Sequence, residues 1–175
     1  FGNPVHYLTV QEPHDQLVVE ARSRIDVQPL PASIDLGASE RWVETRESLA
    51  AAADDTMLQA FQFVFDSPYS VADEDVRDYA LQSFVGDRPV LEAAMDLTSR
   101  IYGEFEYRGG VSDVSTPVRD VFGMRKGVCQ DFAHLEIACL RSLGLAARYV
   151  SGYLRTRPPE GKEKLVGADA SHAWL

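Results

Sequence analysis

The chain has 175 residues, of which 45% are hydrophobic and 25% charged, so it can bury a sizeable core. Its formal net charge of −10 argues against nucleic acid or an anionic membrane as the main partner, because neither would be attracted to such a surface. No apolar run approaches the roughly 20 residues that a membrane-spanning helix needs.

The N-terminal part of the chain predicts β structure followed by a connector. Apolar and polar residues alternate on both sides of Glu12-Pro13-His14-Asp15, which is typical of a hairpin around a turn. A lone hairpin is marginally stable, so we expect residues 1–30 to be the end of an N-terminal β region. Residues 31–70 lack clean periodicity and are predicted to form a connector that packs partly on the core.

Three helices are predicted over residues 73–84, 87–103 and 117–124. The first has acidic residues in its first turn and apolar residues at helical spacing. The second is expected to start with Asp87 as its cap and Pro89 near its first position, and to end at Gly103. Its predicted apolar face consists of Leu91, Ala94, Met95, Thr98 and Ile101.

The clearest helix is expected over residues 129–143, where Phe132, Leu135, Cys139 and Leu143 form one stripe and Gly144 follows the C-terminus. Two strands, at 146–154 and 169–175, are then expected to pair as a hairpin. Together these elements predict an α+β fold in which residues 71–175 form the core domain.

Cys129 is the strongest candidate for chemistry, because it stands where a glycine-marked turn becomes a helix. The free backbone N–H groups and the positive end of the helix dipole at that point favour a thiolate, which is the nucleophilic form. Cys139 lies about 15 Å further along the helix, beyond the reach of a disulfide. It fits the apolar stripe and is predicted to be a buried, structural residue.

Other polar residues of this helix are poor partners for Cys129. His134 is five positions away, about 140° around the helix, so we do not expect it to act as the base or to share a metal with Cys129 and Cys139. Asp131 lies in the first turn, where its carboxylate can accept backbone N–H bonds. Its charge opposes thiolate formation, so we interpret it as structural.

His172 is the best candidate for the base. It lies between the small residues Ser171 and Ala173 in the second predicted strand. A cysteine at a helix start and a histidine on a strand can meet only through the fold, which is how Cys/His sites are commonly built. There His172 would deprotonate the thiol and later protonate the leaving amine.

Several segments, in this order, resemble the bacterial branch of the transglutaminase-like superfamily. They begin with Phe1-Gly2-Asn3-Pro4-Val5-His6-Tyr7 and include Gly127-Val128-Cys129-Gln130-Asp131-Phe132-Ala133, Arg148-Tyr149-Val150-Ser151-Gly152-Tyr153 and Ser171-His172-Ala173-Trp174. The resemblance implies a papain-like core, with the nucleophile at a helix N-terminus packed on an antiparallel sheet, and a Cys-His-Asp triad. By it Cys129 is the nucleophile and His172 the base. The third residue is expected on the next strand, beyond Leu175, so that this core is C-terminally incomplete; Asp169 precedes the histidine and does not match it.

The chemistry implied by the resemblance is attack of a thiolate on a carboxamide, with a thioester intermediate. Hydrolysis of peptide or protein amides is favoured over transamidation, and no metal or cofactor is expected. The Cys129 N–H is expected to donate to the oxyanion. Gln130 and Trp174 are predicted neighbours of the site. Tyr107 is a further candidate neighbour, but core packing is the favoured interpretation for it. The 155–167 loop is expected to border the cleft and to be mobile.

Two other functions stay open at this point. A non-catalytic binding or assembly module would keep the fold without the triad aspartate. A zinc-binding domain is disfavoured by the spacing of the cysteines and His134. The two free thiols suit a reducing compartment, and we therefore expect a cytoplasmic protein.

Overall fold

The computed structural model describes residues 5–20, 22, 24–28, 34–52, 54–154 and 171–175. The chain divides into two compact units, residues 1–34 and residues 35–175. The described residues of the first unit are exposed and contain no strand, so the hairpin predicted there is not formed in them. A two-stranded ribbon without a covering layer is marginal in water, which explains this difference. The assignment of residues 1–30 to a β region stays a prediction.

Residues 35–70, predicted to be a connector, lie in the same compact unit as the rest of the chain. They form a 3-10 turn, η1 (Leu36–Ala38), and the helices α1 (Trp42–Ala51) and α2 (Asp55–Phe61). Trp42 and Leu49 are buried in the core, and the Trp42 indole N–H donates to the carbonyl of Gly86 at 2.9 Å. This segment, which begins the second unit, therefore contributes side chains to its core.

Helix α3 (Glu74–Leu81) begins as expected, since the Asp73 side chain accepts the Val76 N–H at 3.0 Å. The start predicted for α4 (Val90–Glu104) is wrong in detail. Pro89 takes the cap position instead of Asp87, and the helix continues through Gly103 to Glu104.

The buried face of α4 matches the predicted one at Ile101 and partly at Ala94, but not at Leu91 and Met95. Ala93, Leu97 and Ile101 are buried, whereas Leu91 and Met95 are 43% and 49% exposed. This helix has one apolar stripe that contains Ala93 and Leu97 and another that contains Leu91 and Met95, and helical periodicity alone does not show which stripe faces the core. The contacts of α4 with the neighbouring helices determine which stripe is buried.

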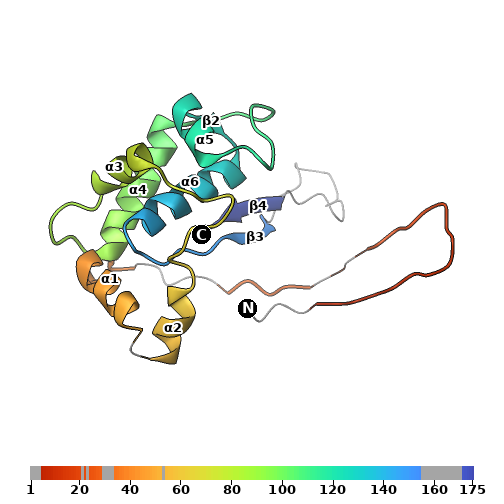
Figure 1. The fold of residues 1–175 in the computed structure, drawn as a ribbon, viewed down its shortest axis with the longest axis horizontal. Coiled ribbons are helices and arrows are strands. Elements are labelled where there is room, and N and C mark those ends of the chain that lie inside the picture. The colour runs from red at the N-terminus through yellow and green to blue at the C-terminus, as the bar shows by residue number, and fades with distance from the viewer. Residues whose placement is uncertain (1–4, 21, 23, 29–33, 53, 155–170) are drawn as a thin grey trace, which may run out of the picture. The chain divides into compact units, whose positions relative to one another are not determined.

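The predicted helices α5 (Val118–Met124) and α6 (Cys129–Ser142) are both present. α6 is the central helix of the unit and packs against α3, α4 and α5 (Figure 1). Leu135 and Cys139 of its predicted stripe are completely buried. Gly144 follows the helix with φ +79°, a conformation that favours glycine at a helix C-terminus.

Two small pairs of strands complete the unit. β1 (Glu106–Tyr107) runs parallel to β2 (Lys126–Gly127), which leads directly into α6. β3 (Val150–Tyr153) pairs antiparallel with β4 (Ser171–Trp174), as predicted, and β4 packs on α6 (Figure 1). The α+β fold class is thus confirmed, while the 155–167 loop lies outside the described residues. No helix in the described part of the chain is long and apolar enough to cross a membrane.

Candidate active site

Cys129 is the first residue of α6, directly after the short β2 strand. Val128 before it is extended, with φ −119° and ψ −179°, so the chain changes from strand to helix at the thiol. Cys129 is half-buried and free, whereas Cys139 is fully buried. Burial raises the pKa of Cys139 to about 12, which agrees with the structural role predicted for it.

Asp131 holds the turn in front of the nucleophile. Its Oδ2 accepts the Val128 N–H at 2.8 Å and the Ser112 hydroxyl at 2.5 Å, and its side chain is buried. Gly127 lies so close that an added Cβ would be 2.8 Å from Asp131 Oδ2. These contacts agree with the structural interpretation of Asp131, and they require glycine at position 127.

A second support of the turn was missed by the sequence reasoning. The Arg125 guanidinium lies 4.3 Å from the ring centroid of Phe122, 4.6 Å from that of Phe105 and 5.1 Å from that of Tyr79. Its Nη1 is 3.3 Å from Glu104 Oε2. The rings of Tyr79, Phe105 and Phe122 thus form an aromatic cage around the Arg125 guanidinium. Arg125 has φ +55° and directly precedes β2, so this cage fixes the chain just before the turn that leads into Cys129. Aromatic residues this far apart in the sequence give no local signal of a shared cage.

His172 lies in β4 opposite Gly152 and is half-buried. Because β4 packs on α6, the structure brings together the two elements that carry His172 and Cys129. Trp174 is on the same face of the strand as His172, two residues on. Its ring covers Gly152, where an added Cβ would lie 2.7 Å from the indole. Trp174 therefore packs across the hairpin over Gly152, which is the register partner of His172.

Tyr107 lies next to the nucleophile turn, because it is the register partner of Gly127. Its ring packs against Phe132 at a centroid distance of 6.4 Å and is 62% exposed. The interpretation of core packing is therefore wrong for Tyr107. Asp169, which the sequence reasoning set aside, lies outside the described residues.

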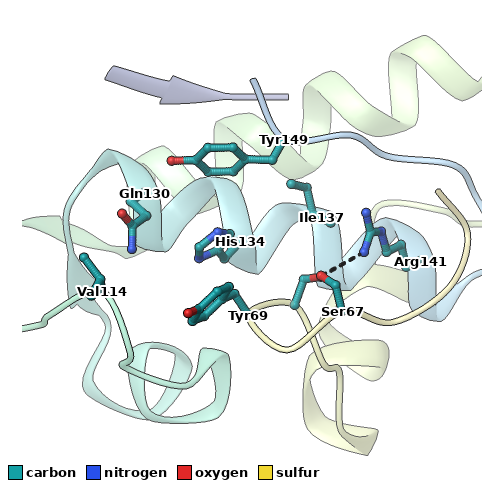
Figure 2. Close-up of a pocket in the computed structure, with 9 residues that line it drawn as sticks. Ser67, Tyr69, Val114, Gln130, His134, Ile137, Arg141 and Tyr149 are labelled. Atoms are coloured by element: carbon teal, nitrogen blue, oxygen red, sulfur yellow. Dashed lines mark hydrogen bonds between the residues drawn. The ribbon is translucent and has the colours of Figure 1, made fainter. Parts of the chain in front are cut away.

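A pocket of about 390 Å³ begins at Gln130, the residue after the nucleophile (Figure 2). His134 lies inside it between two tyrosines, with ring centroids 5.7 Å from Tyr69 and 5.0 Å from Tyr149. Burial lowers the pKa of His134, so the ring is neutral near pH 7; Arg141 adds to this shift and Asp131 opposes it. The sequence reasoning excluded His134 as the base but missed its aromatic partners, which come from distant segments.

Comparison with known proteins agrees with this geometry. Residues 77–175, more than half of the chain, match the sequence profile of the transglutaminase-like superfamily. This chain belongs to that superfamily. The match includes α6, β3 and β4, and so it includes both Cys129 and His172 of this transglutaminase-like chain.

Relatives of this transglutaminase-like chain occur in mycobacteria. An uncharacterized protein of Mycobacterium tuberculosis is 45% identical over 177 residues, which cover 99% of this chain and 54% of the relative. One from Mycobacterium leprae is 28% identical, covering 100% of this chain and 59% of that protein. The chain thus spans somewhat more than half the length of these relatives.

A solved structure with a similar fold comes from Cytophaga hutchinsonii and bears the description "Putative Cysteine Protease". It matches with a TM-score of 0.58 and 27% sequence identity, over 77% of this chain and 43% of the other. The fold predicted from the resemblance, a papain-like and transglutaminase-like core, is therefore confirmed.

Proposed function

We propose that this protein is a cysteine-dependent enzyme that attacks carboxamides of peptide or protein substrates, with hydrolysis as the main outcome. The observation that carries the proposal is the position of Cys129 as the first residue of α6, with β4, the strand that contains His172, packed on the same helix. Superfamily membership and the solved neighbour described as a cysteine protease support it.

The proposed reaction begins when the His172 imidazole takes the proton of the Cys129 thiol. The sulfur attacks the carboxamide carbon, and the carbonyl oxygen becomes an oxyanion. As the first residue of its helix, Cys129 has an N–H with no acceptor inside the helix, so this group is available to stabilise the oxyanion. The C–N bond then breaks, the amine leaves with the proton from His172, and a thioester remains.

Water completes the proposed cycle by attacking the thioester, with His172 again accepting a proton, and releases the acid and the free thiol. An amine in place of water would give transamidation by the same steps. Water is present at far higher concentration than any amine, which favours hydrolysis.

The second candidate function is the alternative that the sequence leaves open, a non-catalytic binding or assembly module. Such a protein would keep the fold, including the packing of β4 on α6, but would not need a reactive thiol at Cys129.

Alkylation by iodoacetamide distinguishes the two candidates. The reaction is followed on the full protein at pH 7 by peptide mass mapping, with Cys139 as the internal control and N-acetylcysteine as the free-thiol reference. The enzyme proposal predicts that Cys129 reacts faster than the reference and that His172→Ala removes the excess rate. It also predicts that Cys129→Ala abolishes amine release from peptide carboxamides. If Cys129 reacts no faster than the reference and activity survives Cys129→Ala, the enzyme proposal is wrong.

A further inference from the structure

The pocket that begins at Gln130 follows one face of α6 (Figure 2). The helix contributes positions i, i+4, i+7 and i+11, which lie on one side of a helix. These residues are Gln130, His134, Ile137 and Arg141, and the other walls are Ser67, Tyr69, Ser70, Val114 and Tyr149. A volume of about 390 Å³ is within the range of small-molecule and side-chain sites.

This pocket opens next to the proposed reaction centre. Gln130 follows Cys129 directly, so the first wall of the pocket is adjacent to the nucleophile. Tyr149 precedes β3, whose first residue Val150 pairs with Trp174 two positions from His172. Burial raises the pKa of the Tyr149 phenol, and the negative charges of Cys129 and Asp131 raise it further.

The walls of the pocket are suited to uncharged groups. Tyr69 and Tyr149 offer aromatic faces on both sides of the neutral His134, and Val114 and Ile137 add aliphatic surface. The nine described lining residues include no carboxylate.

Arg141 is the one lining residue with a formal charge near pH 7, and that charge is positive. Its guanidinium donates to the carbonyls of Phe65 and Ala147 and to the hydroxyls of Ser67 and Ser70. An ammonium group entering the pocket would therefore lose its hydration and meet the positive charge of Arg141, with no carboxylate among the described lining residues to neutralise it.

Building on the cysteine chemistry proposed above, we propose that this pocket binds an uncharged apolar side chain of the substrate, adjacent to the carboxamide that Cys129 attacks, and rejects basic side chains. Transfer of an aromatic or aliphatic side chain from water into the pocket supplies the binding free energy. Discrimination by one apolar pocket is of the order of 10- to 100-fold.

Two chloromethyl ketones, N-acetyl-phenylalanyl and N-acetyl-lysyl, test the pocket on the full chain. The Cys129 sulfur displaces chloride, a C–S bond replaces the C–Cl bond, and the mass of the protein reports the rate. Each rate is divided by the rate of the same probe with N-acetylcysteine. We expect the phenylalanyl probe to be favoured at least about 10-fold. Equal rates, or a preference for lysine, would overturn the pocket while leaving Cys129 as a nucleophile.

Binding to the Cys129→Ala variant gives a readout that needs no reactive thiol. The His134 ring protons should shift in NMR spectra on addition of N-acetyl-phenylalaninamide and should not shift with N-acetyl-lysinamide. No shift with the phenylalanine ligand contradicts the pocket proposal. The enzyme proposal is judged separately, by the iodoacetamide rate of Cys129.

Variants of exposed pocket residues test whether this pocket causes the preference for the phenylalanyl probe. Tyr69 is 51% exposed, and Tyr69→Ala should bring the probe ratio close to one, whereas Tyr69→Phe should keep it. Val114 is 71% exposed, and Val114→Asp adds a carboxylate that should raise the rate of the lysyl probe. Tyr102→Ala, on an 87% exposed site of α4 outside the pocket, should leave the ratio unchanged. A ratio that survives Tyr69→Ala contradicts the assignment of the preference to this pocket.

Discussion

The Asp131 carboxylate accepts the backbone N–H of Val128 at 2.8 Å, across the residue that carries the thiol. This bond is one half of a capping box, in which a residue of the first helical turn reaches back to the N-cap. It fixes both sides of Cys129, because Val128 precedes the thiol and Asp131 follows it. The position of the nucleophile is therefore set by a side chain that takes no part in the proposed chemistry.

Asp131→Ala should destabilise the fold by about 1–3 kcal/mol, because it leaves the Val128 N–H and the Ser112 hydroxyl without their acceptor. Urea unfolding followed by circular dichroism measures the loss. The exposed Asp78 of α3 provides a matched control, and Asp78→Ala should change stability by less than about 0.5 kcal/mol. Equal effects of the two variants would contradict the role assigned to Asp131.

Gly127→Ala should cost about 1–3 kcal/mol, because the new methyl group would lie 2.8 Å from the Asp131 side chain. We also expect slower alkylation of Cys129, since the turn must shift. Gly103 of α4 has no atom within 4 Å of an added Cβ, so Gly103→Ala should stabilise the protein by about 0.5–1 kcal/mol. Thermal unfolding of both variants measures the two changes in stability, which we expect to have opposite signs. If Gly127→Ala leaves the stability unchanged, the Asp131 side chain can move aside without cost.

Arg125→Lys tests the aromatic cage in front of β2. Lysine keeps the positive charge but lacks the planar group that stacks on Phe105 and Phe122, so we expect a loss of about 0.5–2 kcal/mol. Chemical denaturation of this variant and of Arg119→Lys, at a 77% exposed side chain of α5, provides the comparison. If the two substitutions lower the free energy of unfolding equally, the stacking of the guanidinium on the rings does not contribute to stability.

The buried Glu136 predicts a pH dependence of stability. Its Oε1 lies 2.6 Å from the Thr98 hydroxyl, which favours the charged form, but burial dominates and raises the pKa of this carboxyl. Between the unfolded value of about 4.3 and the raised folded value, the folded state holds a proton that the unfolded state has released. Stability contributed by this group is therefore lost as the pH rises through that window.

Glu136→Gln removes this titration. Relative to the unsubstituted protein, the variant should thus gain stability as the pH rises above the unfolded value of about 4.3, which urea midpoints at several pH values would show. Glu47→Gln, at a 71% exposed side chain of α1, should give a difference that does not vary with pH. A pH-independent difference for Glu136→Gln would mean that the carboxyl is not desolvated as the structure indicates.

Local patterns were enough to predict most of the helical framework. The acidic first turn of α3, Pro117 at the start of a short helix and Gly144 after α6 are signals that act within one helical turn, and each lies where expected. The apolar face of α4 and the burial of Trp42 and Leu49, in particular, within the core were not predictable in this way. Both depend on which neighbouring helix covers a surface, and the sequence of one segment does not contain that information.

The sequence by itself determined where the candidate nucleophile stands, because a helix start and its favourable electrostatics are local properties of the residues around Cys129. It also singled out His172 on its own strand. Only the tertiary structure decided which distant groups support the elements next to Cys129: the Ser112 hydroxyl on Asp131, the rings around Arg125 and the tyrosines around His134. Most of these contacts join different segments of the chain, as Ser112 with Asp131 and Tyr69 with His134, and they form only when burial of the common core brings α6, β3 and the preceding loops together.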